Sequence, residues 1–262
     1  MERLRALVFQ HVDNEHLGYM APALENEGVD IHVINFSRMP DDLKIKYYPV
    51  ETVDMLIVLG GPMGVNNSTN EYPSKEVELA TIKRAIFEAR VPTFGVCLGS
   101  QLIAKALGAE VYQNKKYGKR IKEIGYYGVP LTKTGFKDPI FSGLDSPLSV
   151  LQWHGDAFEL PKGAKRLATS LNCTNQAFVY NQDGALAYGV LFHTEFTPEM
   201  VRQQIINDRE WIHDVEDPRD DVNEEFIIEC ADKNASLMEK ETRIIVRNWV
   251  NMVRARTLTK VI

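Results

Sequence analysis

Short apolar runs alternate with amphipathic stretches through the first half of the chain. The apolar runs have the length of β-strands and cover residues 4–9, 29–34, 55–59 and 92–96. Helical spacing is found at residues 18–28, 74–90 and 100–107. Ser74 is a suitable N-cap for the second of these helices, and Gly108 closes the third. This alternation predicts a three-layer α/β domain, with a mostly parallel sheet between two layers of helices.

The second half is richer in short strands joined by Gly, Pro and Asp turns. These strands are predicted at residues 124–131, 149–153, 166–170, 177–180 and 185–192. They either extend the sheet or pack beside it. A helix at 197–206, with Pro198 in its first position, follows them.

The last part of the chain begins with a strongly acidic stretch. Residues 208–225 carry nine acidic side chains against two basic ones around Pro218, a pattern typical of a solvated connection. A final helical region at about 226–256 has Ile244, Ile245, Trp249 and Val253 near helical spacing, so we expect it to pack against the domain. We therefore expect residues 1–262 to form one domain, with a core at about 1–205 and an acidic connection and helical extension at about 206–262.

Composition narrows the class of protein further. Of the 262 residues, 44% are apolar and 25% charged, as in soluble globular proteins. The net charge of -6 argues against a nucleic-acid partner. No apolar run approaches the roughly 20 residues needed to cross a bilayer, and no signal-peptide pattern opens the chain, so we expect a cytoplasmic protein without a membrane partner. The three cysteines form no Cys-x-x-Cys pair, and we expect no metal site and no cofactor.

One cysteine lies between two glycines where a strand gives way to a helix. Cys97 is flanked by Gly95 and Gly99, the context of a nucleophile elbow, in which small neighbours allow a strained backbone turn. The N-terminus of the following helix would lower the thiol pKa, and its free N–H groups, that of Leu98 first, could hold an oxyanion. A small buried structural cysteine is the alternative; Cys173 and Cys230 lack this context and are interpreted as structural.

A base and its orienting partner follow the last predicted strand. His193 and Glu195 are two residues apart, so both side chains can lie on the same face, where the carboxylate would fix the imidazole tautomer. With Cys97 they compose a candidate Cys-His-Glu triad.

A glycine-rich turn ends the third predicted strand. Gly60, Gly61 and Pro62 lie at the same sheet edge as Cys97, and their N–H groups could complete an oxyanion hole. An ordinary strand-to-loop turn is the alternative. No Gly-Lys-Ser/Thr follows, which argues against a phosphate loop.

Taken together, these motifs resemble those of the class I (triad-type) glutamine amidotransferases. The family pattern appears as Gly60-Gly61-Pro62, as Gly95-Val96-Cys97-Leu98-Gly99-Ser100-Gln101 and as His193-Thr194-Glu195. The resemblance covers about residues 1–205 and is strongest to stand-alone relatives of the amidotransferase domain of GMP synthase. Features that point there are Gln10-His11, Glu123-Ile124-Gly125, Trp153-His154-Gly155-Asp156 and Asn175-Gln176-Ala177-Phe178. Thr194 and Leu191 depart from the family's usual Pro and Gln, but neither position supplies a side chain that the chemistry needs.

The resemblance implies a flavodoxin-like fold and a hydrolase that cleaves a γ-glutamyl amide through a thioester on Cys97. It places the substrate, glutamine or another γ-glutamyl compound, along Gly60, Gly61, Leu98 and Gln101, with backbone near Ile124 or Tyr126 as a further contact. About 55 residues follow position 205, too few for a synthetase domain, so ammonia would pass to a separate synthetase subunit. Two alternatives remain: a γ-glutamyl peptidase acting on glutathione-like peptides, and a non-enzymatic binding subunit of a synthetase.

Two further patterns have open interpretations. Residues 153–156 (Trp-His-Gly-Asp) would either shape the substrate entrance or form a turn in which Asp156 caps the backbone. The basic cluster, Lys115, Lys116, Lys119, Arg120 and Lys122, is either a solvated loop or a site for the distal carboxylate of a peptide substrate.

Overall fold

A computed structural model describes residues 3–39, 45–214 and 222–260. Within these residues the main sheet has seven strands in the order β11-β12-β13-β4-β3-β1-β2. Its strands are β1 (Leu4–Gln10), β2 (Val29–Asn35), β3 (Met55–Val58), β4 (Thr93–Val96), β11 (Lys165–Ala168), β12 (Ala177–Tyr180) and β13 (Ala187–Val190). The pairs β2-β1, β1-β3, β3-β4 and β4-β13 are parallel, whereas β12 is antiparallel to both of its neighbours.

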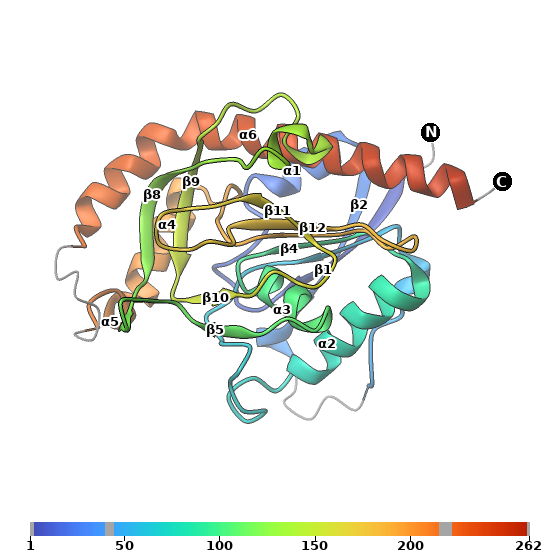
Figure 1. The fold of residues 1–262 in the computed structure, drawn as a ribbon, viewed down its shortest axis with the longest axis horizontal. Helices are drawn as coiled ribbons and strands as arrows, with labels where there is room; N and C mark the ends of the chain where they lie inside the picture. Colours follow the sequence, from blue (N-terminus) through green and yellow to red (C-terminus); the bar gives the residue numbers. More distant parts are fainter. Residues whose placement is uncertain (1–2, 40–44, 215–221, 261–262) are drawn as a thin grey trace.

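Helices cover both faces of this sheet, as the sequence predicts (Figure 1). The helices are α1 (Met20–Asn26), α2 (Lys75–Lys83), α3 (Leu98–Ala106), α4 (Pro198–Asn207), α5 (Arg209–Ile212) and α6 (Glu224–Lys260). Short 3-10 turns lie at Phe36–Arg38, Val50–Thr52, Gly135–Lys137 and Pro139–Phe141. One buried core joins the sheet to α1 and α6, and a second joins it to α2 and α3. The mixed α/β fold is therefore confirmed.

The side chains of β1 show why its run is apolar almost throughout. Ala6 and Val8 belong to the core under α1 and α6, while Leu7 and Phe9 belong to the core under α2 and α3. Successive residues of a strand point to opposite faces, and here both faces are buried.

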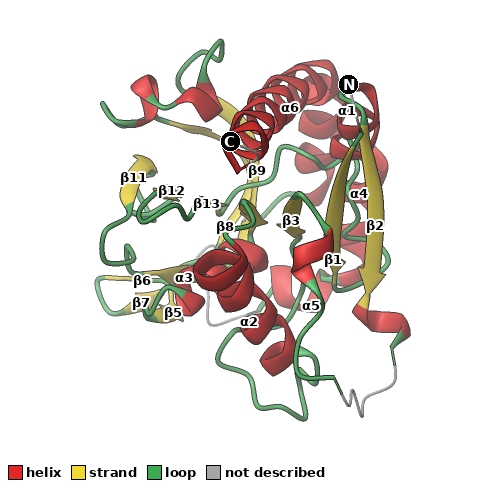
Figure 2. Ribbon diagram, turned by 90° about the vertical axis from the view of Figure 1, so that its right-hand side faces the viewer, coloured by secondary structure: helices red, strands yellow, loops and turns green. Residues whose placement is uncertain are grey.

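Three strand pairs lie outside the main sheet in the described part of the chain, and only the longest of them was predicted. It joins β8 (Glu123–Val129) to β9 (Leu148–His154) in antiparallel register and, in a side view, stands next to the sheet (Figure 2). The unpredicted pairs join β5 (Val111–Gln113) to β10 (Asp156–Phe158), and β6 (Lys115–Lys116) to β7 (Lys119–Arg120). These strands are two or three residues long, too short for a period-2 pattern to show.

The predicted helix at 74–90 differs from the structure in two ways. It is α-helical only to Lys83 and continues as a π-helix at Arg84–Ala89. Ser74 does occupy the N-cap position, but its hydroxyl donates to Glu78 Oε1 at 2.6 Å instead of capping a backbone N–H. A local carboxylate has thus replaced the expected cap.

The acidic connection is also more structured than predicted. It contains the short helix α5, whose Ile212 is buried, and α6 already begins at Glu224. Pro218 lies outside the described residues. No helix in the described part of the chain is both long and apolar enough to span a membrane.

Candidate active site

Cys97 occupies a strained turn between β4 and α3. Its φ of 48° and ψ of -110° lie outside the regions that L-residues prefer. A side chain on Gly99 would overlap the carbonyl of Val58, and one on Gly95 would overlap the carbonyl of Gly99. Gly99 is therefore required by close packing of the elbow against β3, and Gly95 by the close approach of Gly99 within the turn. The sequence prediction of such a turn agrees with the backbone.

His193 and Glu195 are held side by side just after β13. His193 Nδ1 lies 2.7 Å from Glu195 Oε1, and Glu195 Oε2 accepts a hydrogen bond of 3.0 Å from the N–H of Thr194. Two backbone hydrogen bonds, of 2.8 and 3.1 Å, join His193 to Leu151 of β9. Because Nδ1 faces the carboxylate, Nε2 is the ring nitrogen left for Cys97.

The electrostatics of the buried pair have opposing causes. Burial alone would lower the pKa of His193, but the charge of Glu195 and the contact with Cys97 outweigh it, so that this pKa lies well above its ordinary value. Burial raises the pKa of the Cys97 thiol, and the hydrogen bond and charge of His193 offset that rise only in part. The net pKa of the thiol is therefore raised instead of lowered as expected, because desolvation is the largest effect on it.

The glycine-rich turn passes directly beneath the triad residues. A side chain on Gly60 would overlap Glu15 Oε2 and would lie 3.2 Å from His193 Cε1 and 3.6 Å from Cys97 Cβ. A Cβ on Gly61 would lie 2.9 Å from Leu98 Cδ2. The structure thus brings Gly60 and Gly61 next to the elbow, as the sequence predicts.

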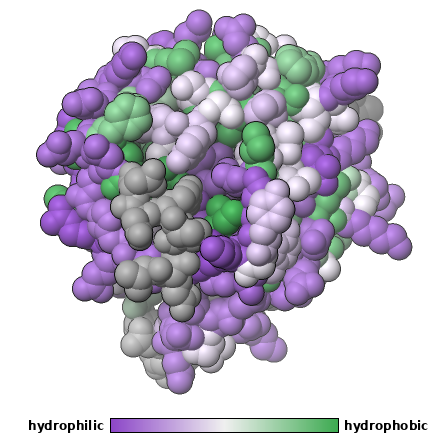
Figure 3. Space-filling view, turned by 60° about the vertical axis from the view of Figure 1, so that its left-hand side comes forward, coloured by the Kyte–Doolittle hydropathy of each residue, from purple (hydrophilic) through white to green (hydrophobic). Residues whose placement is uncertain are grey.

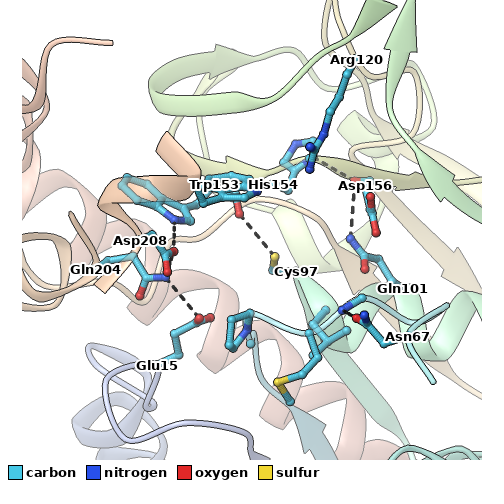
Figure 4. Close-up of a pocket in the computed structure, with 17 residues that line it drawn as sticks. Glu15, Asn67, Cys97, Gln101, Arg120, Trp153, His154, Asp156, Gln204 and Asp208 are labelled. Carbon is cyan, nitrogen blue, oxygen red and sulfur yellow. Dashed lines mark hydrogen bonds between the residues drawn. The ribbon is translucent and has the colours of Figure 1, made fainter. Parts of the chain in front are cut away.

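Cys97 lies at the floor of a cavity of about 350 Å³ (Figure 4). Its Sγ lies 3.7 Å from the carbonyl oxygen of Trp153. Gln101 lines one side of the cavity and donates to the Asp156 carbonyl at 3.5 Å, and Gly61 and Leu98 also line it. Ile124 and Tyr126, near which a further backbone contact is predicted, are not among the residues that line this cavity; both line a different one, beside α6.

The opposite side of the cavity is acidic, and sequence reasoning missed it. Glu15, Gln204 and Asp208 lie together there (Figure 4), and Gln204 Nε2 donates to Glu15 Oε1 at 3.3 Å and to Asp208 Oδ2 at 2.6 Å. The pKa of Glu15 is raised to about 7: burial is the largest cause, the charge of His193 opposes it, and the charge of Asp208 adds to it. Its position in the sequence could have identified Glu15, because it follows the carboxyl end of β1, at the sheet edge where ligands bind.

Residues 153–156 form part of the cavity wall, which supports the site-shaping interpretation. Trp153 Nε1 donates to Asp208 Oδ2 at 2.8 Å, and Asp156 lines the cavity. His154 Nδ1 lies 3.0 Å from the Asp156 carbonyl oxygen, and His154 Nε2 lies 3.1 Å from Glu123 Oε2. His154 therefore contacts the backbone oxygen of Asp156. The capping alternative would instead require a hydrogen bond to the Asp156 carboxylate.

The basic cluster does not behave as a unit. Arg120 lines the cavity and bonds Asp214 at 3.1 Å, while Lys122 is fully buried and donates to the carbonyl of Trp211. Lys115 and Lys119 are exposed on the β6–β7 hairpin. The solvated-loop interpretation therefore holds for part of the cluster only.

The geometry brings a buried cysteine, histidine and glutamate together beside the glycine-rich turn, and the family comparison agrees with it. The family described as "Glutamine amidotransferase class-I" matches residues 11–211, and this chain belongs to that family. Within the described residues no group of three or more His, Cys, Asp or Glu side chains is arranged to hold a metal ion.

Individual relatives are similar over most of the matched region. The chain is 38% identical over 168 residues to the glutamine amidotransferase-like protein YfeJ of Salmonella typhimurium, covering 63% of this chain and 66% of that protein. It is 30% identical over 171 residues to one subunit of the glutamine-hydrolyzing GMP synthase of Saccharolobus solfataricus, covering 64% of this chain and 77% of that protein. It spans only 35% of the GMP synthase of Borrelia garinii.

Solved structures share the fold at lower identity. A crystal structure of a glutamine amidotransferase from Thermotoga maritima superposes with a TM-score of 0.79 at 28% identity, covering 95% of this chain and 99% of that one.

Proposed function

We propose that this chain hydrolyses the side-chain amide of glutamine to glutamate and ammonia, with Cys97, His193 and Glu195 as its catalytic residues. The observation that carries the proposal is the placement of a strained cysteine beside a buried His–Glu pair, at the floor of a cavity lined by Gly61 and Leu98. A non-enzymatic binding subunit would have no need of a matched nucleophile, base and orienting group.

The reaction would proceed in two halves. The Cys97 thiol gives its proton to His193 as its sulfur attacks the amide carbon, and the N–H groups of Gly61 and Leu98 bind the resulting oxyanion. His193 gives its proton to the nitrogen, the C–N bond breaks, and ammonia leaves a thioester on Cys97. His193 then removes a proton from water, which attacks the thioester and releases glutamate and the thiol.

The acidic side of the cavity favours glutamine over a glutathione-like peptide. The leaving amine departs toward His193, and Glu15 lies beside that histidine. A peptide leaving group would bring its own carboxylate toward Asp208 and toward Glu15, which is charged above its pKa of about 7, and like charges repel.

Transfer of the ammonia to a separate synthetase subunit is a second part of the proposal. It is supported by the similarity to one subunit of the Saccharolobus solfataricus GMP synthase. On the face that Figure 3 shows, apolar residues are scattered over a mostly hydrophilic surface, so a partner that docks there would meet chiefly polar groups.

Glutamate release from glutamine, glutathione and other γ-glutamyl peptides tests the proposal. We expect kcat/KM for glutamine to exceed that for glutathione by about 10-fold or more, because a total repulsion of about 1.4 kcal/mol corresponds to a factor of ten. Cys97→Ser should remove the activity, and Cys173→Ser, which changes a buried cysteine outside the triad, should retain it. A preference for the peptides would instead identify a γ-glutamyl peptidase.

A further inference from the structure

A buried chain of polar groups lies behind the glycine-rich turn and is not used by the proposed reaction. His11 Nδ1 lies 2.7 Å from the carbonyl oxygen of Gly60, and His11 Nε2 lies 2.7 Å from Glu78 Oε2. His11 is 2% exposed and Glu78 is 0% exposed. Three separate elements, the end of β1, the end of β3 and α2, are thereby joined beneath the turn.

The hydrogen bonds determine where the protons are. The Gly60 carbonyl can only accept, so His11 Nδ1 carries a proton. Glu78 already accepts hydrogen bonds from the hydroxyls of Tyr72, at 3.0 Å, and Ser74, at 2.6 Å, as a carboxylate does. With Glu78 as the acceptor of both hydroxyls, its hydrogen bonds are completed when His11 Nε2 donates to it as well, and a ring with two donors is an imidazolium.

The surroundings of His11 agree with a charged ring. Burial lowers the pKa of His11, but the charge of Glu78, its hydrogen bond, the Gly60 carbonyl and the charge of Glu15 together raise it above its ordinary value. Tyr72 lies edge-on to the ring, with the centroids 6.0 Å apart, and Phe36 stacks at 5.9 Å. The ring is thus enclosed by protein, and water cannot take over its contacts with Gly60 and Glu78.

The Gly60 carbonyl belongs to the same peptide group as the N–H of Gly61. In a trans peptide these two groups point in opposite directions, so a carbonyl directed at His11 leaves the N–H directed away from it. Gly61 lines the cavity beside Cys97, and among the described residues no backbone acceptor is found for its N–H. A charged donor on the carbonyl strengthens the N–H of the same peptide as a donor, because hydrogen bonds in a chain polarise one another.

We propose that His11, held as an imidazolium by Glu78, is a positioning residue that orients and polarises the Gly60–Gly61 peptide for binding the oxyanion. This inference rests on the proposed function, in which the Gly61 N–H is an oxyanion donor. His11 does not touch the substrate; it acts through one peptide group on the transition state.

Two matched substitutions separate the peptide contact from the contact with Glu78. In His11→Asn the amide nitrogen can take the place of Nδ1 and still donate to Gly60, without the charge. In His11→Gln the amide nitrogen falls near the place of Nε2 and can reach Glu78 but not Gly60. Their sizes and polarities are similar, so a purely structural role would affect them alike.

The expected result is a split between kcat and KM on glutamine. His11→Gln should lower kcat by about 10²-fold, which is the usual effect of losing one oxyanion-hole donor. His11→Asn should lower kcat by about 10-fold or less. KM should stay within about twofold of the wild-type value in both variants. Glu78→Gln, which removes the counter-charge, should resemble His11→Asn. Equal losses in the two His11 variants, or a His11→Gln enzyme within twofold of the wild type, would overturn the inference.

Nuclear magnetic resonance gives an answer that does not depend on activity, and its measurement on the His11 ring needs only the wild-type protein. With ¹⁵N-labelled histidine and glycine, both ring nitrogens of His11 should show attached protons between pH 6 and 8, and the Gly61 amide should shift when Glu78→Gln removes the counter-charge. A neutral His11 ring refutes the inference. A charged ring in a protein that hydrolyses no γ-glutamyl amide would refute the proposed function while leaving the polarised peptide in place.

Discussion

At the level of single residues, the reactivity of each cysteine follows from its neighbours. Burial and the charge of Glu123 raise the pKa of Cys173 to about 12, so its thiolate is scarce at neutral pH. Cys97 is also buried, but it has His193 to receive its proton and a cavity that admits a ligand. Both thiols are buried, so the difference we expect in their reactivity comes from the proton acceptor and the cavity beside Cys97.

Chemical labelling tests that difference. A chloroketone analogue of glutamine should alkylate Cys97 at pH 7 at least about 100-fold faster than Cys173, because only Cys97 combines a proton acceptor with a substrate cavity. Peptide mapping by mass spectrometry identifies the site, and Cys97→Ala is the control that should abolish the label. Label found on Cys173 or Cys230 with Cys97 unmodified would contradict the assignment of the nucleophile.

Glu15 is expected to make stability depend on pH. Its pKa is about 7 in the folded protein and near 4.5 when unfolded, so between these values the folded state binds the additional proton. Stability from this group is therefore lost as pH rises from about 4.5 through 7. Glu15→Gln should gain on the order of 2 kcal/mol relative to the wild type between pH 5 and pH 8.

Urea unfolding at the two pH values measures that gain. Glu241, whose pKa is also raised to about 7 by burial, titrates in the same window but is present in both proteins, so the difference between them isolates Glu15. A constant difference between wild type and Glu15→Gln at pH 5 and 8 would show that Glu15 titrates in its ordinary range.

At the level of helices and strands, the last helix contributes directly to the site. Thr242 of α6 donates from its hydroxyl to the carbonyl of Thr194 at 2.6 Å, and Thr194 is the residue between His193 and Glu195. Thr242 is 1% exposed, so no water can replace this donor. An element distant in sequence thereby fixes the backbone that carries the base and its partner.

Thr242→Val should therefore impair both stability and catalysis. The substitution keeps the shape of the side chain but leaves the buried Thr194 carbonyl without its donor, which should cost about 1–3 kcal/mol in the free energy of unfolding. It should also lower kcat several-fold, because the backbone that carries His193 and Glu195 is held less firmly. Thr257→Val is the matched control, because Thr257 bonds the Val253 carbonyl one turn earlier in the same helix. If both variants keep the wild-type kcat, α6 has no part in positioning the pair.

Across the molecule as a whole, α6 belongs to the same core as the sheet. The helix runs along one face of the molecule (Figure 1). It buries Ile245, Val246, Trp249, Val250 and Val253 against the layer that contains β1, β3 and β4. This packing agrees with the expectation for Ile245, Trp249 and Val253, whereas Ile244 is only half-buried and lies outside this core.

A shortened chain tests whether the region from 206 onward is an extension or an essential layer. A chain that ends at Ile212 should lose cooperative thermal unfolding, because the removal of α6 exposes one face of the sheet and an apolar area too large for a stable domain. Near-ultraviolet circular dichroism and calorimetry measure this, with a chain ending at Thr257 as the control. Cooperative unfolding of the shorter chain within a few degrees of the control would show that residues 1–212 fold alone.

Much of the fold could be predicted from local patterns, and the exceptions have physical causes. The parallel strands, the elbow and the paired His193 and Glu195 are specified within a few neighbouring residues, since periodicity, flanking glycines and i, i+2 spacing are all local. The π-helix after Lys83 and the short strands β5, β6, β7 and β10 carry no such local signature. Their conformations depend on what they pack against.

Local sequence was enough to predict the layered fold, the family and the three residues proposed for catalysis. The surroundings of those residues arise only in the folded molecule, which brings Glu15 beside His193, Thr242 onto Thr194, and Glu78 with His11 behind Gly60. Each of these contacts joins residues at least 48 positions apart in the sequence, and no pattern along the chain encodes such a pairing. The physical reason is that desolvation and charge act through space, so the properties of a buried group are fixed only when the elements around it have packed.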